Sequence, residues 1–144
     1  KWVKQSIHYW CPDTKEHKFL GQNVTVAILD TGISPHPDFK DRILSFRDFS
    51  STTGSSEKVL FSFSHFSPLI DNSGHGTHVA GILAGSGLLS SGTYAGIAPF
   101  CNLIIGKVLD QNGNGSIKNV INGIQWIRDI YTQFHIRIIN ISVG

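Results

Sequence analysis

The chain has 144 residues, of which 12 are Lys or Arg and 10 are Asp or Glu, so its formal net charge is only +2. Because the basic residues are scattered along the sequence, the charge pattern argues against a dedicated nucleic-acid or membrane surface. No apolar run approaches the ~20 residues of a membrane-spanning helix, and a chain of this length fits one domain with its own core.

Residues 1–21 carry the weakest structural signal. They mix aromatic residues with charges and show no clear period, so we expect an arm that lies over the outside of a domain formed by residues 22–144. Cys11 in this arm and Cys101 in the domain have neither metal-ligand nor redox-motif spacing. We expect two free thiols, with a disulfide as the alternative.

The first clear element is a strand over residues 24–29. Its sequence, Val-Thr-Val-Ala-Ile-Leu, is apolar almost throughout, which is typical of a strand buried on both faces of a parallel sheet. Asp30 follows at the carboxyl end of this strand, and Thr31-Gly32 turns the chain away. Since ligands of open α/β sheets bind at that edge, Asp30 is a candidate functional carboxylate.

A turn and a second strand precede a long polar segment. Residues 34–38, Ser-Pro-His-Pro-Asp, predict the turn, and residues 42–49 predict a short strand. Residues 50–70 are rich in Ser and Thr, but residues 61–65 alternate strictly between ring-bearing side chains and serine. Because two is the strand period, we expect an inserted β-arm that either folds its phenylalanines onto the domain or exposes them to a partner.

The stretch from residue 71 to residue 81 is a polar loop that runs directly into a helix of small residues. It places His75 in the first helical turn. A histidine at such a junction can reach into a cleft, and its unperturbed pKa suits proton transfer near neutral pH, so His75 is a candidate general base. The helix is expected to continue to about residue 86, and its Ala and Gly residues would let the helix and sheet backbones approach closely.

Two more strands and one more helix complete the pattern. Residues 102–109 predict a buried strand, a turn follows at 110–115, and Ser116 is the expected N-cap of an amphipathic helix. Residues 136–142 predict the last strand. Strands and helices alternate, so we predict an α/β fold with a three-layer, doubly wound parallel sheet. The residues expected to pack the last helix on the sheet are Ile117, Val120, Ile121, Ile124, Ile127 and Tyr131.

Four stretches of the sequence, in this order and separation, resemble one protein family. Asp30-Thr31-Gly32 and residues 75–81, His-Gly-Thr-His-Val-Ala-Gly, are similar to the aspartate and histidine motifs of the subtilisin-like serine proteases. Residues 96–99, Gly-Ile-Ala-Pro, and residues 140–144, Asn-Ile-Ser-Val-Gly, agree with the same family. The resemblance runs from about residue 22 to the end, and it implies the N-terminal part of a catalytic domain, because the Gly-Thr-Ser nucleophile motif is not in the sequence.

The resemblance implies a serine endopeptidase that hydrolyses peptide bonds with an Asp-His-Ser triad, of which this chain carries Asp30 and His75. In that mechanism one ring nitrogen of the histidine takes the serine proton while a buried carboxylate holds the other. Taken singly, Asp30 would also fit a turn carboxylate, and His75 would fit a helix N-terminal residue without chemistry. As an ordered pair with matching flanks, they favour catalysis.

Two other chemistries are less well supported. His78, three residues after His75, suggests zinc, but a catalytic zinc site needs three protein ligands and no Glu follows His75 in the metalloprotease pattern. We expect His78 to pack and support the helix. Asp30-Thr31-Gly32 also matches the aspartic-protease triplet, which requires a second carboxylate in an all-β fold. The predicted helices argue against that mechanism.

By the same resemblance, a peptide substrate would lie as an extended strand between two stretches of this chain. One stretch is the turn Asn112-Gly113-Asn114. The other is Ser142-Val143-Gly144, which would line the pocket for the residue before the scissile bond, and Leu109 and Ile117 would border an apolar pocket further along. The alternative for these residues is a surface turn and core packing.

The mechanism needs no cofactor, and the structural calcium of the family is the one ion to consider. Asp38 matches the position of a calcium ligand in many subtilisins, but one carboxylate is far from the roughly six to eight oxygens that calcium takes. The loop that would supply further ligands, residues 85–94, contains no carboxylate and no asparagine. We therefore favour a helix- or turn-capping role for Asp38 over a calcium site.

The second function that we consider is a non-catalytic half-domain or pseudoenzyme that binds a partner chain. In either case we expect protein partners: substrate, the remaining part of the domain with its serine, and a prosegment, but neither nucleic acid nor membrane. Secretion is favoured over the cytoplasm. Because residues 136–142 are expected to have further strands beyond them, we also expect residues 1–144 alone to be inactive and to associate through an open sheet edge.

Overall fold

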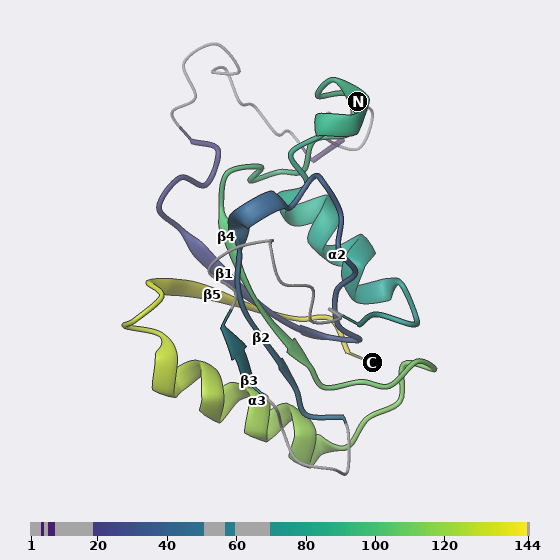
Figure 1. Cartoon of the computed structure of the whole chain (residues 1–144), viewed down its shortest axis with the longest axis vertical. Helices are drawn as coiled ribbons and strands as arrows, with labels where there is room; N and C mark the ends of the chain where they lie inside the picture. The colour runs from purple at the N-terminus through teal and green to yellow at the C-terminus, as the bar shows by residue number, and fades with distance from the viewer. Residues whose placement is uncertain (1–3, 5, 8–18, 51–56, 60–69, 144) are drawn as a thin grey trace.

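Within the part of the chain that the computed structural model describes, residues 4, 6–7, 19–50, 57–59 and 70–143, the fold is built around a five-stranded sheet (Figure 1). Its strand order is β3-β2-β4-β1-β5. β1, β2, β4 and β5 pair in parallel, and the short β3 pairs antiparallel with β2. The strands are β1 (Thr25–Asp30), β2 (Ile43–Asp48), β3 (Glu57–Val59), β4 (Asn102–Lys107) and β5 (Ile136–Ile141).

Two α-helices cover opposite faces of this sheet, α2 (His75–Ala84) on one and α3 (Ile117–Ile130) on the other (Figure 1). Short 3-10 turns lie at Lys40–Arg42 and Leu88–Ser90. β1 is buried along its whole length, with Val26 and Ile28 in the cluster under α2 and Ala27 and Leu29 in the cluster under α3. Burial on both faces is what makes this strand apolar at consecutive positions. The predicted three-layer α/β fold is confirmed.

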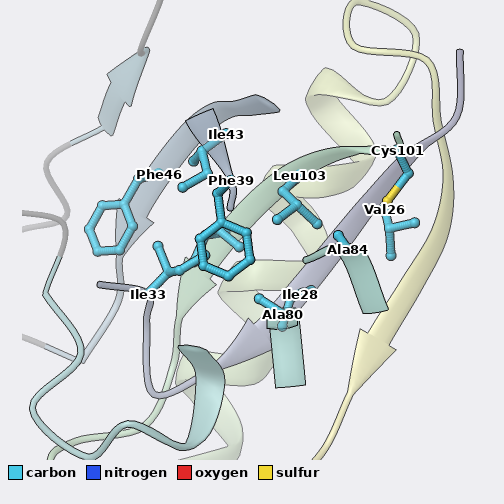
Figure 2. Close-up of a cluster of buried hydrophobic side chains, with 11 residues drawn as sticks. Val26, Ile28, Ile33, Phe39, Ile43, Phe46, Ala80, Ala84, Cys101 and Leu103 are labelled. Atoms are coloured by element: carbon cyan, nitrogen blue, oxygen red, sulfur yellow. The ribbon is translucent and has the colours of Figure 1, made fainter. Parts of the chain in front are cut away.

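In the cluster under α2, the fully buried residues of the helix are small, and Val79 and Leu83 pack against the cluster while partly buried. Ala80 and Ala84 are fully buried there, and Figure 2 shows them beside the side chains of the sheet and of the loop after β1. Cys101 is buried in the same cluster as a free thiol, and desolvation raises its pKa. Cys11 lies outside the described residues. The members of this cluster are Val26, Ile28, Ile33, Phe39, Ile43, Phe46, Ala80, Ala84, Cys101, Leu103 and Ile105.

The helix α3 begins where predicted but buries a different face. The Asn119 amide donates to Ser116 Oγ at 3.2 Å, which is the expected N-cap. Trp126 and Ile127 pack on the sheet around Gly123, with Val120 and Ile130 partly buried beside them. The prediction was wrong for four residues, because the helix is apolar over a wider arc than the sheet covers. These exposed residues are Ile117, Ile121, Ile124 and Tyr131.

The last strand, β5, lies at one edge of the sheet as far as the structure describes it, and it pairs only with β1. After the buried Ile136, the strand is open on both faces, and Ile138, Ile139 and Ile141 are 54%, 41% and 42% exposed. The expected open edge is therefore present in the described chain. An edge of this kind offers unpaired backbone groups together with apolar side chains.

Several expectations fall on residues that the structure does not describe. The alternating stretch at residues 61–65, most of residues 1–21, and Gly144 lie outside the described residues. Within residues 50–70 the structure describes β3, whose backbone pairs with β2 from Ser45 to Arg47. This strand belongs to the segment in which we expected an inserted β-arm.

Candidate functional site

Asp30 and His75, which the sequence placed in separate motifs, meet at the carboxyl edge of the sheet. Asp30 is the last residue of β1, His75 is the first residue of α2, and Nδ1 of His75 lies 2.8 Å from Oδ1 of Asp30. The carboxylate is fully buried, whereas the imidazole is 52% exposed. The pair thus consists of a protected acceptor and a ring that another molecule can reach.

The electrostatics of this pair favour a charged imidazole. The hydrogen bond to Asp30, followed by the charge of Asp30, raises the pKa of His75 above its ordinary value, and the nearby charge of Asp71 adds to the effect. A carboxylate that holds one ring nitrogen also fixes which nitrogen carries the proton in the neutral ring. An imidazole held in this way is able to accept a proton on its second nitrogen and to keep the resulting charge stabilised.

Two glycines allow the Asp30 loop and α2 to touch. Gly32 has φ +116°, and a Cβ at this position would lie 2.1 Å from the carbonyl oxygen of Ile70. At Gly76 a Cβ would lie 2.3 Å from the carbonyl oxygen of Gly32. A side chain at position 76 would push α2 away from the loop after β1, and one at position 32 would push away the backbone of Ile70, in the segment before α2. These contacts explain why a glycine occurs in both the aspartate motif and the histidine motif.

Lys107 is a buried cation close to the site. The sequence patterns had not singled out this residue. It ends β4 beside Asp30, with which it is paired across the strands, and it is 6% exposed. Its ammonium donates to the carbonyl oxygens of Thr31 and Leu109 at 2.5 and 2.8 Å. The lysine therefore ties the loop after β1 to the chain after β4. A single charge inside an apolar strand was the signal that could have revealed it.

The two stretches expected to flank a substrate leave the sheet on either side of Asp30. β4 and β5 are the parallel neighbours of β1, so the turn after β4 and the residues after β5 emerge at the same edge as the Asp30–His75 pair (Figure 1). Ser142 and Val143 are exposed, and Ser142 Oγ accepts a hydrogen bond from the side-chain Nδ2 of Asn140 at 2.8 Å. Gly144 lies outside the described residues.

The turn Asn112-Gly113-Asn114 is exposed and is held by Asp110. The carboxylate of Asp110 accepts the backbone N–H groups of Asn112 and Asn114 at 2.8 and 2.9 Å, and its carbonyl accepts that of Gly113 at 3.2 Å. The turn therefore uses its own N–H groups internally. Leu109 is 8% exposed and packs in the α3 cluster, in line with the core-packing alternative, whereas Ile117 is 81% exposed.

Asp38 binds backbone N–H groups of the loop after α2. Its Oδ2 accepts from Gly87 at 3.0 Å, and its Oδ1 accepts from Leu89 at 3.3 Å. Calcium requires oxygen ligands, but this loop directs hydrogen-bond donors at the carboxylate. No group of three or more His, Cys, Asp or Glu side chains that could hold a metal occurs within the described ranges. The contacts of Asp38 agree with the capping role expected for it.

The expectation that His78 packs against the domain is wrong. The buried stripe of α2 is Gly76, Ala80 and Ala84, at steps of four residues, and His78 lies away from it on the exposed side. Steps of four follow one face of a helix, whereas a residue two positions from Gly76 or Ala80 points outward. His78 therefore neither supports the core nor joins the Asp30–His75 pair.

Comparison with known proteins decides the family. The model of the subtilase family matches residues 21–144. The chain belongs to the subtilase family. Among curated subtilase relatives, it is 46% identical to serine protease AprX of Bacillus subtilis over 106 residues, which are 74% of this chain and 21% of AprX. It is 38% identical over 126 residues to the major intracellular serine protease of the same organism, covering 86% of this chain and 35% of that protein.

Solved structures agree with this subtilase assignment. The CspB protease of Clostridium perfringens superposes with a TM-score of 0.74 at 25% identity, over 90% of this chain and 30% of CspB. Sphericase superposes with a TM-score of 0.70 at 30% identity, over 86% of this chain and 38% of sphericase. The chain thus spans about a fifth to two fifths of the length of the subtilases it matches. Among the described residues, no helix has the length and apolar character needed to cross a bilayer.

Proposed function

We propose that this chain supplies the aspartate and histidine of a serine endopeptidase whose serine comes from the remaining part of the domain. The observation that carries the proposal is the 2.8 Å contact between a fully buried carboxylate and a half-exposed imidazole at the carboxyl edge of a parallel sheet. Membership in the subtilase family, together with the finding that the chain spans only about a fifth to two fifths of the length of the subtilases it matches, supports the division of the triad.

In the proposed reaction, His75 acts as base and then as acid. Its Nε2 takes the proton of the serine hydroxyl as the serine oxygen attacks the peptide carbonyl carbon, and it returns that proton to the amine that leaves. Water then hydrolyses the acyl-enzyme by the same proton path. Asp30 remains ionised throughout and stabilises the imidazolium, which is why a buried acceptor on Nδ1 is needed.

The proposed substrate is an extended peptide that lies between the turn after β4 and the residues after β5. The parallel pairing of β4 and β5 on either side of β1 supports this path. Since the N–H groups of Asn112, Gly113 and Asn114 bond to Asp110, we expect the carbonyl oxygens of Asn112 and Gly113 to be the groups that the turn offers to a peptide. Ser142 and Val143 would contact the peptide from the other side. A prosegment that occupies this path and secretion of the protein remain predictions.

The test uses the intact protein that contains this chain and its serine. We expect His75→Ala to lower kcat/KM on a chromogenic peptide by roughly four to six orders of magnitude, and Asp30→Asn by about four. His78→Ala is the matched control, because it removes an exposed imidazole from the same helix and should leave the rate close to wild type. Loss of turnover in a folded His78→Ala protein, with turnover kept in His75→Ala, would overturn the assignment.

The second candidate function is a half-domain that acts by binding a partner chain, which the exposed isoleucines of β5 favour. Mass spectrometry of the purified natural protein, together with labelling by a serine-directed fluorophosphonate, separates the two proposals. A companion segment that carries the label supports the peptidase. An unlabelled partner bound to this chain supports the binding function.

A further inference from the structure

The loop before α2 contains a carboxylate, Asp71, that belongs to neither the aspartate motif nor the histidine motif. Asp71 lies four residues before His75, and both of its oxygens are engaged. Oδ1 accepts from the Thr31 hydroxyl and from the Gly74 amide, each at 2.8 Å, and also from the Ser73 amide at 3.2 Å. Oδ2 accepts from the amide and the hydroxyl of Thr77 at 2.8 and 2.5 Å. One side chain thus caps the first turn of α2 and holds the loop after β1.

Two threonine hydroxyls connect the Asp30 loop and the His75 helix in opposite directions. Thr31, next to Asp30, donates to Asp71 and accepts the amide of Gly76 at 2.9 Å. Thr77, on α2, donates to Asp71 and accepts the amide of Ser34 at 2.9 Å. Each hydroxyl therefore links Asp71 to a backbone group of the other segment. This crossed arrangement leaves the two segments little freedom to slide past each other.

We propose that Asp71 is a positioning residue for the Asp30–His75 pair, setting the distance between the carboxylate and the imidazole and adding a second negative charge near the imidazole. The inference rests on the proposed peptidase function for its kinetic consequences. Its structural basis is independent of turnover, because the five hydrogen bonds and the two bridging threonines lie within this chain.

The charge of Asp71 is well protected against protonation. Burial alone would raise its pKa, but the hydrogen bonds from Thr77, Thr31 and Gly74 together outweigh burial and hold the pKa below its ordinary value. A carboxylate in this state is ionised at neutral pH. It therefore acts on His75 as a fixed negative charge throughout the pH range in which an imidazole titrates.

The groups around His75 set the direction of the expected pH effect. Asp30 from β1 and Asp71 from the loop both raise the pKa of His75, Asp30 more strongly. Lys107 from β4 holds its ammonium on the Thr31 and Leu109 carbonyls, and His78 on α2 is exposed. Removal of the Asp71 charge should therefore lower the pKa of His75. Since the neutral imidazole is the base, the acid limb of kcat/KM should then move to lower pH.

Two variants of the intact protein separate geometry from charge. Asp71→Asn removes the charge and part of the acceptor capacity, so we expect kcat to fall roughly ten- to a hundredfold with little change in KM, and the acid limb to move to lower pH. Thr77→Val keeps the charge but removes one bridging hydroxyl, so kcat should fall while the acid limb stays in place. Asp129→Asn, a carboxylate on α3 that is 62% exposed, is the charge-matched control and should change neither quantity.

An NMR titration of the His75 ring in the same variants gives a readout that does not depend on turnover. A lower pKa for His75 in Asp71→Asn, with an unchanged value in Asp129→Asn, supports the inference even if the wild type proves inactive, in which case only the peptidase proposal fails. A folded Asp71→Asn protein with wild-type kcat and an unchanged His75 titration would overturn it. If Asp71→Asn does not fold, wild-type kcat in Thr77→Val would overturn it instead.

Discussion

The two faces of the sheet differ in how completely this chain covers them. On the α2 face, Ala80 and Ala84 are fully buried against β1 and β4, and crossed hydrogen bonds through Asp71 join the helix to the loop after β1. On the α3 face, Trp126 and Ile127 are buried, but Ile117 and Ile121 on the same helix remain exposed.

We therefore call the α2 side of the sheet the complete side and the α3 side the incomplete side. The Asp30–His75 pair lies on the complete side, where hydrogen bonds within this chain hold the loop after β1 against the start of α2. β5, by contrast, is open on both faces after Ile136, and its three exposed isoleucines form an apolar edge. At about 25 cal/mol per Å², a few hundred Å² of such surface corresponds to several kcal/mol, which is comparable with the whole stability of a domain.

The strongest test of the comparison is the behaviour of residues 1–144 expressed alone. We expect them to self-associate through β5 and to lack peptidase activity, because the edge is apolar and unpaired. Ile139→Lys should reduce the association, since a charge on an edge strand opposes pairing. Ile82→Lys, the same change at an exposed position of α2, is the matched control and should not. A monodisperse, cooperatively unfolding wild-type fragment in sedimentation and thermal unfolding would contradict the comparison.

A pair of glycines on α2 tests how closely the complete side is packed. Gly76→Ala places a methyl group against the Gly32 carbonyl, so we expect destabilisation of about 1–3 kcal/mol in the intact protein. Gly81→Ala meets no atom within 4 Å and should stabilise the helix by up to about 1 kcal/mol. Urea denaturation of both variants measures the difference. Equal stabilities for the two would show that α2 is not pressed against the Asp30 loop.

Chelation should have the smallest effect. If calcium were required at Asp38, the α2 side would depend on an ion and would not be complete by itself. The N–H groups of Gly87 and Leu89 already occupy this carboxylate, so we expect EDTA to leave Tm nearly unchanged, because a ligand stabilises only as far as it occupies the native state. A large fall in Tm that added calcium reverses would refute this.

Sequence patterns predicted the elements well where the signal is local. The apolar run before Asp30, the Ser116 cap and the small residues of α2 each specify a strand or a helix through neighbours in the chain. The strand and helix boundaries accordingly lie within about two residues of their expected positions, which is the usual scatter of such limits.

Features that depend on distant partners were not predictable in the same way. The exposure of Ile117 and Ile121 depends on how much of α3 the sheet covers, which the helical period does not encode. The role of Asp71 depends on Thr31, which lies 40 residues away in the sequence. His78 is the exception, because the four-residue spacing of Gly76, Ala80 and Ala84 already indicated the buried side of the helix.

The strand order also determines when the parallel strands can pair while the chain is being synthesised. β1 pairs with β4 and β5, and the parallel partner of β2 is β4, so both strands remain without parallel neighbours until residues 102–107 have left the ribosome. At about 5–20 residues per second, translation of residues 31–101 lasts roughly 4–14 seconds. During this interval β1, a strand that is buried along its whole length in the folded protein, is complete but cannot yet be enclosed between its final neighbours. β1, although encoded first, therefore gains both of its neighbours in the sheet late.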